Sequence, residues 1–183
     1  MERADAARNR ALILEAAASL FAERSPQDVT MDDIAKKAGV GRGTLYRRYP
    51  DRASIAVALL DEHERELQGR LLRGEPPLGP GAPPAQRLAA FYAAMVRLLE
   101  DHSHLVLGSE VGRSRFETGA YGFWRAHVRT ILAAAQTPDP EALVDVLLAP
   151  LAPEVYDYQR RVLGLDPKQI TQALDRLAAI LDR

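Results

Sequence analysis

The segment that most restricts the fold of this chain is residues 29–52, VTMDDIAKKAGVGRGTLYRRYPDR. The Thr30 hydroxyl can accept a hydrogen bond from the free backbone amides of a helix that begins directly after it. Asp33, three residues later, completes a weaker form of the capping box. Gly39 is expected to end this helix, because glycine adopts the left-handed backbone conformation at the least cost. The pattern predicts one short helix with a turn immediately behind it.

A second short helix is predicted from about Arg42 to Tyr49, and Pro50 stops it. Leu45 and Tyr49 lie one helical turn apart and are expected to face the core. The glycine-containing turn at residues 39–41 joins the two helices. This arrangement predicts a helix-turn-helix, in which the second helix can enter the major groove of DNA.

The open side of the second helix is rich in groups that bind phosphates or base edges. An arginine near the start of such a helix, here Arg42, can donate two hydrogen bonds to a guanine. Tyr46, Arg48 and Arg52 suit phosphates, which position a protein on DNA without reading its sequence. The backbone amides that follow Thr30 offer a further phosphate site. The candidate DNA-contacting residues are Thr30, Arg42, Gly43, Thr44, Tyr46, Arg47, Arg48, Tyr49 and Arg52.

Charge is unevenly distributed along the chain. The 183 residues carry a formal net charge of −1, but residues 36–52 hold six basic residues and one acidic residue, a local charge of +5. The remaining residues must therefore sum to −6. That asymmetry predicts one face that attracts a polyanion.

Helical spacing extends over most of the rest of the chain. One amphipathic helix is expected at 8–23 and a longer one over 51–72. A kink or break is expected at Pro150 and Pro153. Residues 166–169 carry a cap, a proline at the first helical position and a glutamine at the third, which together mark the start of the last helix.

The predicted fold is all-α and consists of two parts. The first is a helix-turn-helix three-helix bundle over 1–52, followed by the connecting helix. Residues 74–84, GEPPLGPGAPP, hold five prolines and three glycines and are expected to form a linker. The second part is a larger helical domain over 85–183.

Aromatic side chains gather in the first half of this larger domain. With one methionine, they can line an apolar pocket, although each taken alone is more readily explained as ordinary core. The candidate ligand-binding residues are Phe91, Tyr92, Met95, Phe116, Tyr121, Phe123 and Trp124.

Two apolar stretches near the C-terminal end can pack against their copies in a second subunit and form a four-helix interface. Burial inside the same subunit fits the spacing equally well. The candidate interface residues are Val144, Leu147, Leu148, Ile170, Leu174, Leu177 and Leu181.

Several classes of site are not expected. The chain has no cysteine, which excludes disulfides and thiolate metal sites. His102 and His104, with Asp101 or Glu110, are a weak metal candidate, because residues two apart do not share a helix face. No catalytic triad or nucleotide-binding loop is visible, so neither a cofactor nor an enzyme activity is expected. No apolar run is long enough to span a membrane, and the N-terminal residues lack a signal-peptide core, so we expect a cytoplasmic protein.

The pattern V-T-x-x-x-I-A-x-x-A-G-V-x-x-G-T-L-Y-x-x-Y-P-D-R across residues 29–52 resembles the DNA-binding domain of the tetracycline-repressor (TetR) family of bacterial transcriptional regulators. The family often has a capping residue where Gly41 stands, an aromatic-histidine pair where Arg47 and Arg48 stand, and lysine at Arg52. The basic replacements preserve affinity for phosphates.

The resemblance implies a homodimer that binds a palindromic operator in double-stranded DNA. It also implies a ligand pocket in the C-terminal domain, a dimer interface formed by the last two helices, and release from DNA by a small apolar or amphipathic effector. Repression is the default expectation. A regulator of the same fold that is controlled by a protein partner or needs no ligand is the main alternative, and an enzyme using the C-terminal pocket is a weaker one.

Overall fold

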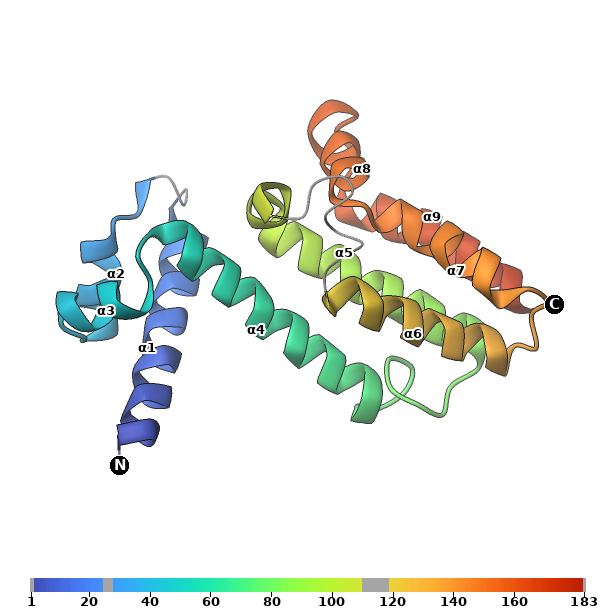
Figure 1. The fold of residues 1–183 in the computed structure, drawn as a ribbon. Coiled ribbons are helices and arrows are strands. Elements are labelled where there is room, and N and C mark those ends of the chain that lie inside the picture. Colours follow the sequence, from blue (N-terminus) through green and yellow to red (C-terminus); the bar gives the residue numbers. More distant parts are fainter. Residues whose placement is uncertain (1, 25–27, 110–118, 183) are drawn as a thin grey trace. The chain divides into compact units, whose positions relative to one another are not determined.

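The computed structural model describes residues 2–24, 28–109 and 119–182, and within these ranges it is helical with no β-strand (Figure 1). The all-α prediction is confirmed. None of the helices in these ranges has the length and apolar character needed to cross a membrane. The helices are α1 (Glu2–Glu23), α2 (Met31–Ala38), α3 (Arg42–Arg48), α4 (Arg52–Arg73), α5 (Pro84–Ser109), α6 (Gly119–Ala134), α7 (Pro140–Leu148), α8 (Pro153–Asp157) and α9 (Pro167–Ala178).

The chain divides into two compact units, Met1–Glu62 and His63–Arg183. The division falls inside α4, so this helix contributes its first half to one unit and its second half to the other. The sequence predicts an end of the first domain at residue 52 and a linker at 74–84. In the structure, residues 74–83 lie within the second unit.

The N-terminal unit is built on one apolar core to which all four of its helices contribute. Ile13 of α1, Ile34 of α2 and Leu45 of α3 are fully buried. Ile55 of α4 is also fully buried in this cluster. The core therefore fixes the two short helices against the two long ones, since burial of large aliphatic side chains is the main stabilising term in folding.

The proline- and glycine-rich segment between α4 and α5 is a closely packed turn. The Gly79 amide donates a hydrogen bond to the Glu75 carbonyl over 2.9 Å. A Cβ atom on Gly79 would lie 1.7 Å from the Gly74 carbonyl oxygen, so only glycine fits at this position. Gly81 has a φ of +110°, which is open to glycine and strained for other residues. As expected, no regular helix forms in this segment, and the two glycines allow the chain to turn closely between α4 and α5.

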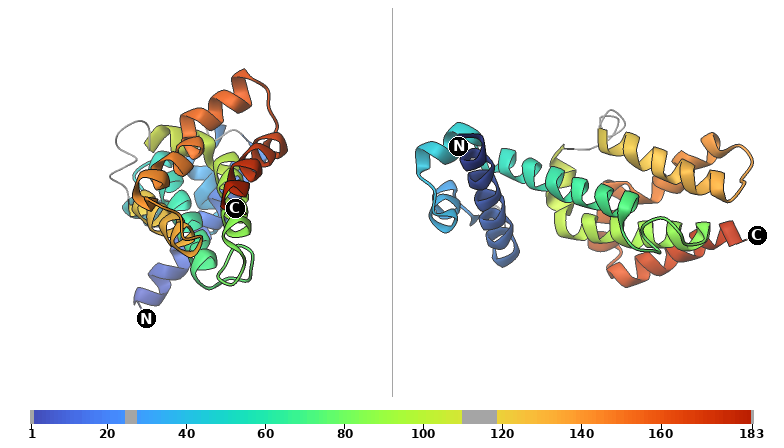
Figure 2. Two further views of the ribbon diagram at one scale, coloured as in Figure 1. Left: turned by 90° about the vertical axis from the view of Figure 1, so that its right-hand side faces the viewer. Right: turned by 90° about the horizontal axis from the view of Figure 1, so that it is seen from below.

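Helix α5 is the centre of the second unit, and α6 and α9 flank it (Figure 2). Leu88, Phe91 and Tyr92 of α5 are fully buried, as are Ile131 and Leu132 of α6. Every helix after α5 thus packs, directly or through a neighbour, against one long apolar helix.

Two sequence signals at the C-terminal end are confirmed. The chain breaks at Pro150 and Pro153, where a short 3-10 helix (Ala149–Leu151) leads into α8. At the start of α9, the Gln169 amide donates to Asp166 Oδ1 over 2.8 Å, and the Asp166 amide donates to Gln169 Oε1 over 2.8 Å. This is a complete capping box.

One core position is polar. His127 of α6 is 7% exposed, and its Nε2 has no hydrogen-bond partner among the described residues. Its ring lies 5.3 Å from that of Phe91, centroid to centroid. Burial, and secondarily the charge of Arg87, lowers the pKa of His127 to about 4. The imidazole is therefore neutral in the folded chain at neutral pH.

We expect the free energy of unfolding to fall as the pH falls from 7 to 5. The unfolded chain binds a proton at His127 with a pKa near 6.5, whereas the folded chain resists it until about pH 4. The loss attributable to this residue is about 1–2 kcal/mol by proton linkage. Urea unfolding at both pH values should show a smaller loss for His127→Phe than for the unsubstituted chain. Equal losses would contradict this assignment.

Candidate functional site

The helix-turn-helix predicted from residues 29–52 is present. The Thr30 side chain accepts a hydrogen bond from the Asp33 amide over 3.1 Å, and the Thr30 amide donates to Asp33 Oδ2 over 3.1 Å. Gly39 ends α2 with a φ of +65°. Gly41 precedes α3 without any side-chain cap. The Thr30 hydroxyl is therefore committed to the start of α2.

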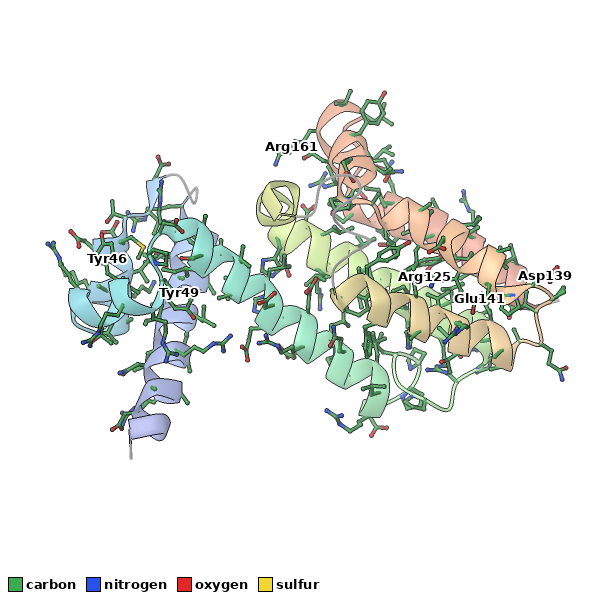
Figure 3. All side chains as sticks on the ribbon, in the orientation of Figure 1. Tyr46, Tyr49, Arg125, Asp139, Glu141 and Arg161 are labelled. Carbon is green, nitrogen blue, oxygen red and sulfur yellow. The ribbon has the colours of Figure 1, made fainter. Side chains whose placement is uncertain are left out.

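Helix α3 is anchored from one side. Leu45 is fully buried, and Tyr49, directly after the helix, is 6% exposed. Both residues occupy the core positions that their spacing predicts. Tyr49 was also a candidate DNA contact, and its burial makes it a core residue instead. Tyr46, which is 48% exposed, lies on the outer side (Figure 3).

The outer side of α3 carries free positive charge. Arg47 and Arg48 are exposed, and neither forms an ion pair or hydrogen bond with any residue that the structure describes. Gly43 is exposed and Thr44 is half-buried. Nothing lies within 4 Å of the position that a Cβ on Gly43 would take, so the backbone is open to a partner there.

Arg42, at the start of α3, differs from these two arginines. Its Nη2 atom forms an ion pair with Asp32 Oδ2 in the first turn of α2. Both side chains are well exposed, so this pair is weak and can exchange for another acceptor. The sequence gives no signal for Asp32 as a partner, because the contact depends on how the two helices cross.

Arg52 was expected to contact a phosphate, but its side chain is hydrogen-bonded within the chain. Its Nη1 atom donates a hydrogen bond to the Val29 carbonyl over 2.8 Å. This bond joins the first residue of α4 to the segment in front of α2. Beside it, Asp51 Oδ1 accepts a hydrogen bond from the Ser54 amide over 2.7 Å and caps α4. We therefore correct Arg52 to a residue that holds the helix-turn-helix against α4.

The first turns of α1 contribute a feature that the sequence did not indicate. Asp5, Ala6 and Asn9 of α1, with Thr44, Arg47 and Arg48 of α3, line a hollow of about 380 Å³. Periodicity in α1 identified the core-facing stripe only. The packing of α1 against α3 decides which polar residues of α1 lie beside α3. The local sequence of α1 does not predict them.

The predicted aromatic pocket is core instead. Phe91, Tyr92, Met95 and Trp124 are buried, and Tyr121 and Phe123 are half-buried. Phe116 lies outside the described residues. The Tyr92 hydroxyl donates to the Leu147 carbonyl over 2.9 Å, and burial raises the pKa of Tyr92 far above its usual value. Tyr121 donates to Asp145 Oδ1 over 2.8 Å. These side chains fill the space between helices.

A groove of about 570 Å³ lies elsewhere in the second unit, between the second half of α4 and α5. None of the predicted aromatic residues that the structure describes lines it. At one end, His63 Nδ1 lies 2.5 Å from His102 Nε2. Its lining consists of His63, Glu66, Leu67 and Arg70 of α4, Leu78 of the turn, and Ala90, Ala93, Ala94, Arg97, Leu98, Asp101 and His102 of α5.

The metal candidate is not supported by what the structure describes. His102 contacts His63 of α4, with its Nε2 2.5 Å from His63 Nδ1. The side chain of His104, and Glu110, lie outside the described residues. Within the described ranges, no three His, Asp or Glu side chains gather in a way that could hold a metal ion.

Most of the predicted interface residues are buried within their own subunit. Val144, Leu147, Leu148, Ile170 and Leu174 are each 6% exposed or less, so they form the core of the second unit. Leu177 and Leu181 are half-buried. A different set of large apolar side chains is exposed between α8 and the C-terminal end: Val155, Tyr158, Val162, Leu163 and Ile180.

Comparison with known proteins agrees with this geometry. Residues 13–59 match a domain described as bacterial regulatory proteins, tetR family. An HTH-type transcriptional regulator from Mycobacterium tuberculosis is 32% identical over 123 residues, which are 67% of this chain and 58% of that protein. The chain therefore spans less than two thirds of the length of this relative.

Solved structures share the fold along nearly the whole chain. A TetR-family transcriptional regulator from Rhodococcus sp. is similar with a TM-score of 0.66 and 18% identity, over 94% of this chain and 98% of that one. A tetR-family transcriptional regulator from Streptomyces coelicolor gives a TM-score of 0.65 and 22% identity, over 94% of this chain and 79% of that one. Residues 13–59 therefore belong to the tetR family of bacterial regulatory proteins, and the chain as a whole shares the fold of solved tetR-family structures.

Proposed function

We propose that this chain is a DNA-binding transcriptional regulator that inserts α3 into the major groove. The observation that carries the proposal is a short helix anchored by Leu45, with the unpaired guanidinium groups of Arg47 and Arg48 on its open side. Free exposed arginines on a helix of this size match the contacts that such helices make with phosphates and bases. The names of the relatives, HTH-type and TetR-family transcriptional regulators, support the same function.

The contacts divide into two kinds. Arg42 stands at the start of α3, where a bidentate contact with guanine O6 and N7 is geometrically favoured. To reach a base it exchanges Asp32 for the DNA, which costs little because the pair is exposed. Tyr46, Arg47 and Arg48 contact the phosphate backbone and fix the register of the helix in the groove.

We propose a homodimer that binds a palindromic operator. Large apolar side chains on and after α8 are exposed, among them Tyr158, Val162 and Leu163. We infer that they form the patch that a second copy covers, because monomers rarely leave such side chains in water. A two-fold interface repeats each contact and places two recognition helices on one face of the duplex. The half-buried Leu177 and Leu181 adjoin the C-terminal end of this set in sequence.

A small-molecule effector that releases a repressor from its operator completes the proposal. Two consecutive residues of α4, Glu62 and His63, each contact another helix. Arg10 Nη1 of α1 lies 2.5 Å from Glu62 Oε2, while the adjacent His63 contacts His102 of α5. A molecule that moves α4 at His63 therefore acts directly beside the contact with α1.

Arg48→Ala should weaken binding to every DNA sequence without changing the stability of the chain. It should also flatten the dependence of log K on log salt by about 0.9 for each phosphate that the side chain no longer neutralises. Arg52→Ala is the matched substitution. It should lower the free energy of unfolding by about 1 kcal/mol, because it removes the bond to the Val29 carbonyl. Fluorescence anisotropy across a salt series, with urea unfolding, separates the two. Identical behaviour of both variants would contradict our distinction between them.

Arg42→Ala should relax the base preference at one position of each half-site and leave the others unchanged. The expected drop in discrimination is about 1–3 kcal/mol at that position. Asp32→Ala is the control, because it frees Arg42 without removing it, and base preference should persist. A competition assay with duplexes substituted at single positions measures both. A uniform weakening across all positions in Arg42→Ala would show that Arg42 contacts only phosphates.

Tyr158→Glu with Val162→Glu should weaken the dimer by tenfold or more, since four charges would enter an apolar interface. Val146→Glu on α7 provides the control, because Val146 is 59% exposed outside the proposed patch. Sedimentation equilibrium gives the dissociation constants. A dimer as tight as that of the unsubstituted chain would refute the interface, and a monomeric unsubstituted chain would refute dimerisation itself.

A further inference from the structure

The groove between α4 and α5 is built from two different surfaces. Its apolar part combines Leu67 and Leu98, which are nearly buried, with the small side chains of Ala90, Ala93 and Ala94. Three alanines on one stretch of α5 leave the space that larger residues would fill. This surface suits a hydrocarbon body, because burying apolar area is favourable without any directional contact.

The polar part of the groove holds two arginines that bind nothing in the described chain. Arg70 of α4 and Arg97 of α5 line it from opposite helices, and neither forms an ion pair or hydrogen bond with a described residue. Three other arginines of the second unit form ion pairs with carboxylates. Arg125 pairs with Asp145, Arg129 with Glu141, and Arg160 with Glu100.

Two carboxylates, Glu66 and Asp101, also line the groove. Each stands four residues from the arginine of its own helix, a spacing at which opposite charges offset each other. The formal charge of these four groups is zero. His63 and His102 are the remaining titratable lining groups, and imidazoles are neutral or positive. The charge of the groove is therefore zero or positive, and its strongest unsatisfied donors are guanidinium groups.

The contact between His63 and His102 closes one end of this surface. At 2.5 Å the facing nitrogens cannot both carry a proton, so one ring accepts from the other. Arg70 lies seven residues beyond His63, about 10 Å along α4 at 1.5 Å per residue. The histidine pair and Arg70 therefore mark two positions about 10 Å apart along the groove, with Glu66 and Leu67 between them on α4.

We propose that this groove binds a small amphipathic carboxylate, such as a medium-chain fatty acid. Arg70 and Arg97 bind the carboxylate, for which a guanidinium supplies two parallel donors. The alanines and leucines cover the hydrocarbon chain. Calling this molecule the effector rests on the proposed function. Its binding to the groove does not, because that binding can be measured without DNA.

Isothermal titration calorimetry with decanoate, decanol and decylamine tests the proposal. Decanoate should bind the unsubstituted chain more tightly than either of the others. Arg70→Gln with Arg97→Gln should weaken decanoate binding by roughly tenfold or more, as expected when charged hydrogen bonds are removed. Arg73→Gln with Arg129→Gln removes the same charge outside the groove and should leave decanoate binding within about twofold of the unsubstituted value.

A third substitution tests the apolar surface. Ala93 is exposed, so Ala93→Phe should fold and fill part of the groove, weakening decanoate and decanol alike. Equal binding of decanoate and decylamine, or unchanged binding after the Arg70 and Arg97 substitutions, would overturn the carboxylate assignment. Unchanged binding in Ala93→Phe would overturn the location.

Adding decanoate to the protein–DNA complex separates this inference from the proposed function. Release of DNA that disappears in the Arg70 and Arg97 double substitution supports both. A chain that binds decanoate in the groove but binds no duplex refutes the regulator and leaves the site intact. A chain that binds DNA but not decanoate refutes the site alone.

Discussion

The structure depends on the burial of one leucine. Helix α3 has seven residues and no side-chain cap at its start, so it is too short to be stable as an isolated helix. Leu45, with no exposed surface, joins it to the core formed by α1, α2 and α4. That anchor allows the opposite side of the helix to remain open and positively charged. The exposed arginines can then be presented in a fixed direction, although they contribute nothing to the packing that holds them.

The same logic extends to α4. Its first half belongs to the core of the N-terminal unit through Ile55 and Leu59, and its second half lines the groove of the second unit. One continuous helix therefore carries residues of both units. Contacts to α1 and to α5 fall on the neighbouring residues Glu62 and His63.

Local signals in the sequence were sufficient to predict where α2 and α9 begin and that residues 29–52 form a helix-turn-helix. Thr30, Gly39 and Asp166 act through hydrogen bonds or backbone angles within four residues, and each was identified correctly. The roles of other residues depend on distant parts of the chain. Arg52 binds the Val29 carbonyl, which no local pattern predicts.

The ligand pocket and the dimer interface of the second unit were harder to predict, because they also depend on contacts between distant parts of the chain. A stripe of apolar residues such as Ile170 and Leu174 has the same spacing whether it faces its own core or a second subunit. Aromatic residues are likewise equally suited to a pocket and to the core, and Phe91 and Tyr92 proved to be core. The groove is lined largely by alanines and charged residues from two helices, which are ordinary surface residues in each helix alone. A composition rich in proline and glycine also predicts a turn as well as a linker, and here the glycines permit close packing.

The central claim is that α3 binds DNA in the major groove and that a dimer presents two symmetry-related copies of it. The most direct test is to select bound sequences from a random pool of duplexes. We expect enrichment of an inverted repeat whose half-sites lie one helical turn apart, about 10–10.5 base pairs, or a multiple of it, with affinity that falls as salt rises. Recovery of no enriched sequence, or binding that is insensitive to salt, would contradict this role of α3.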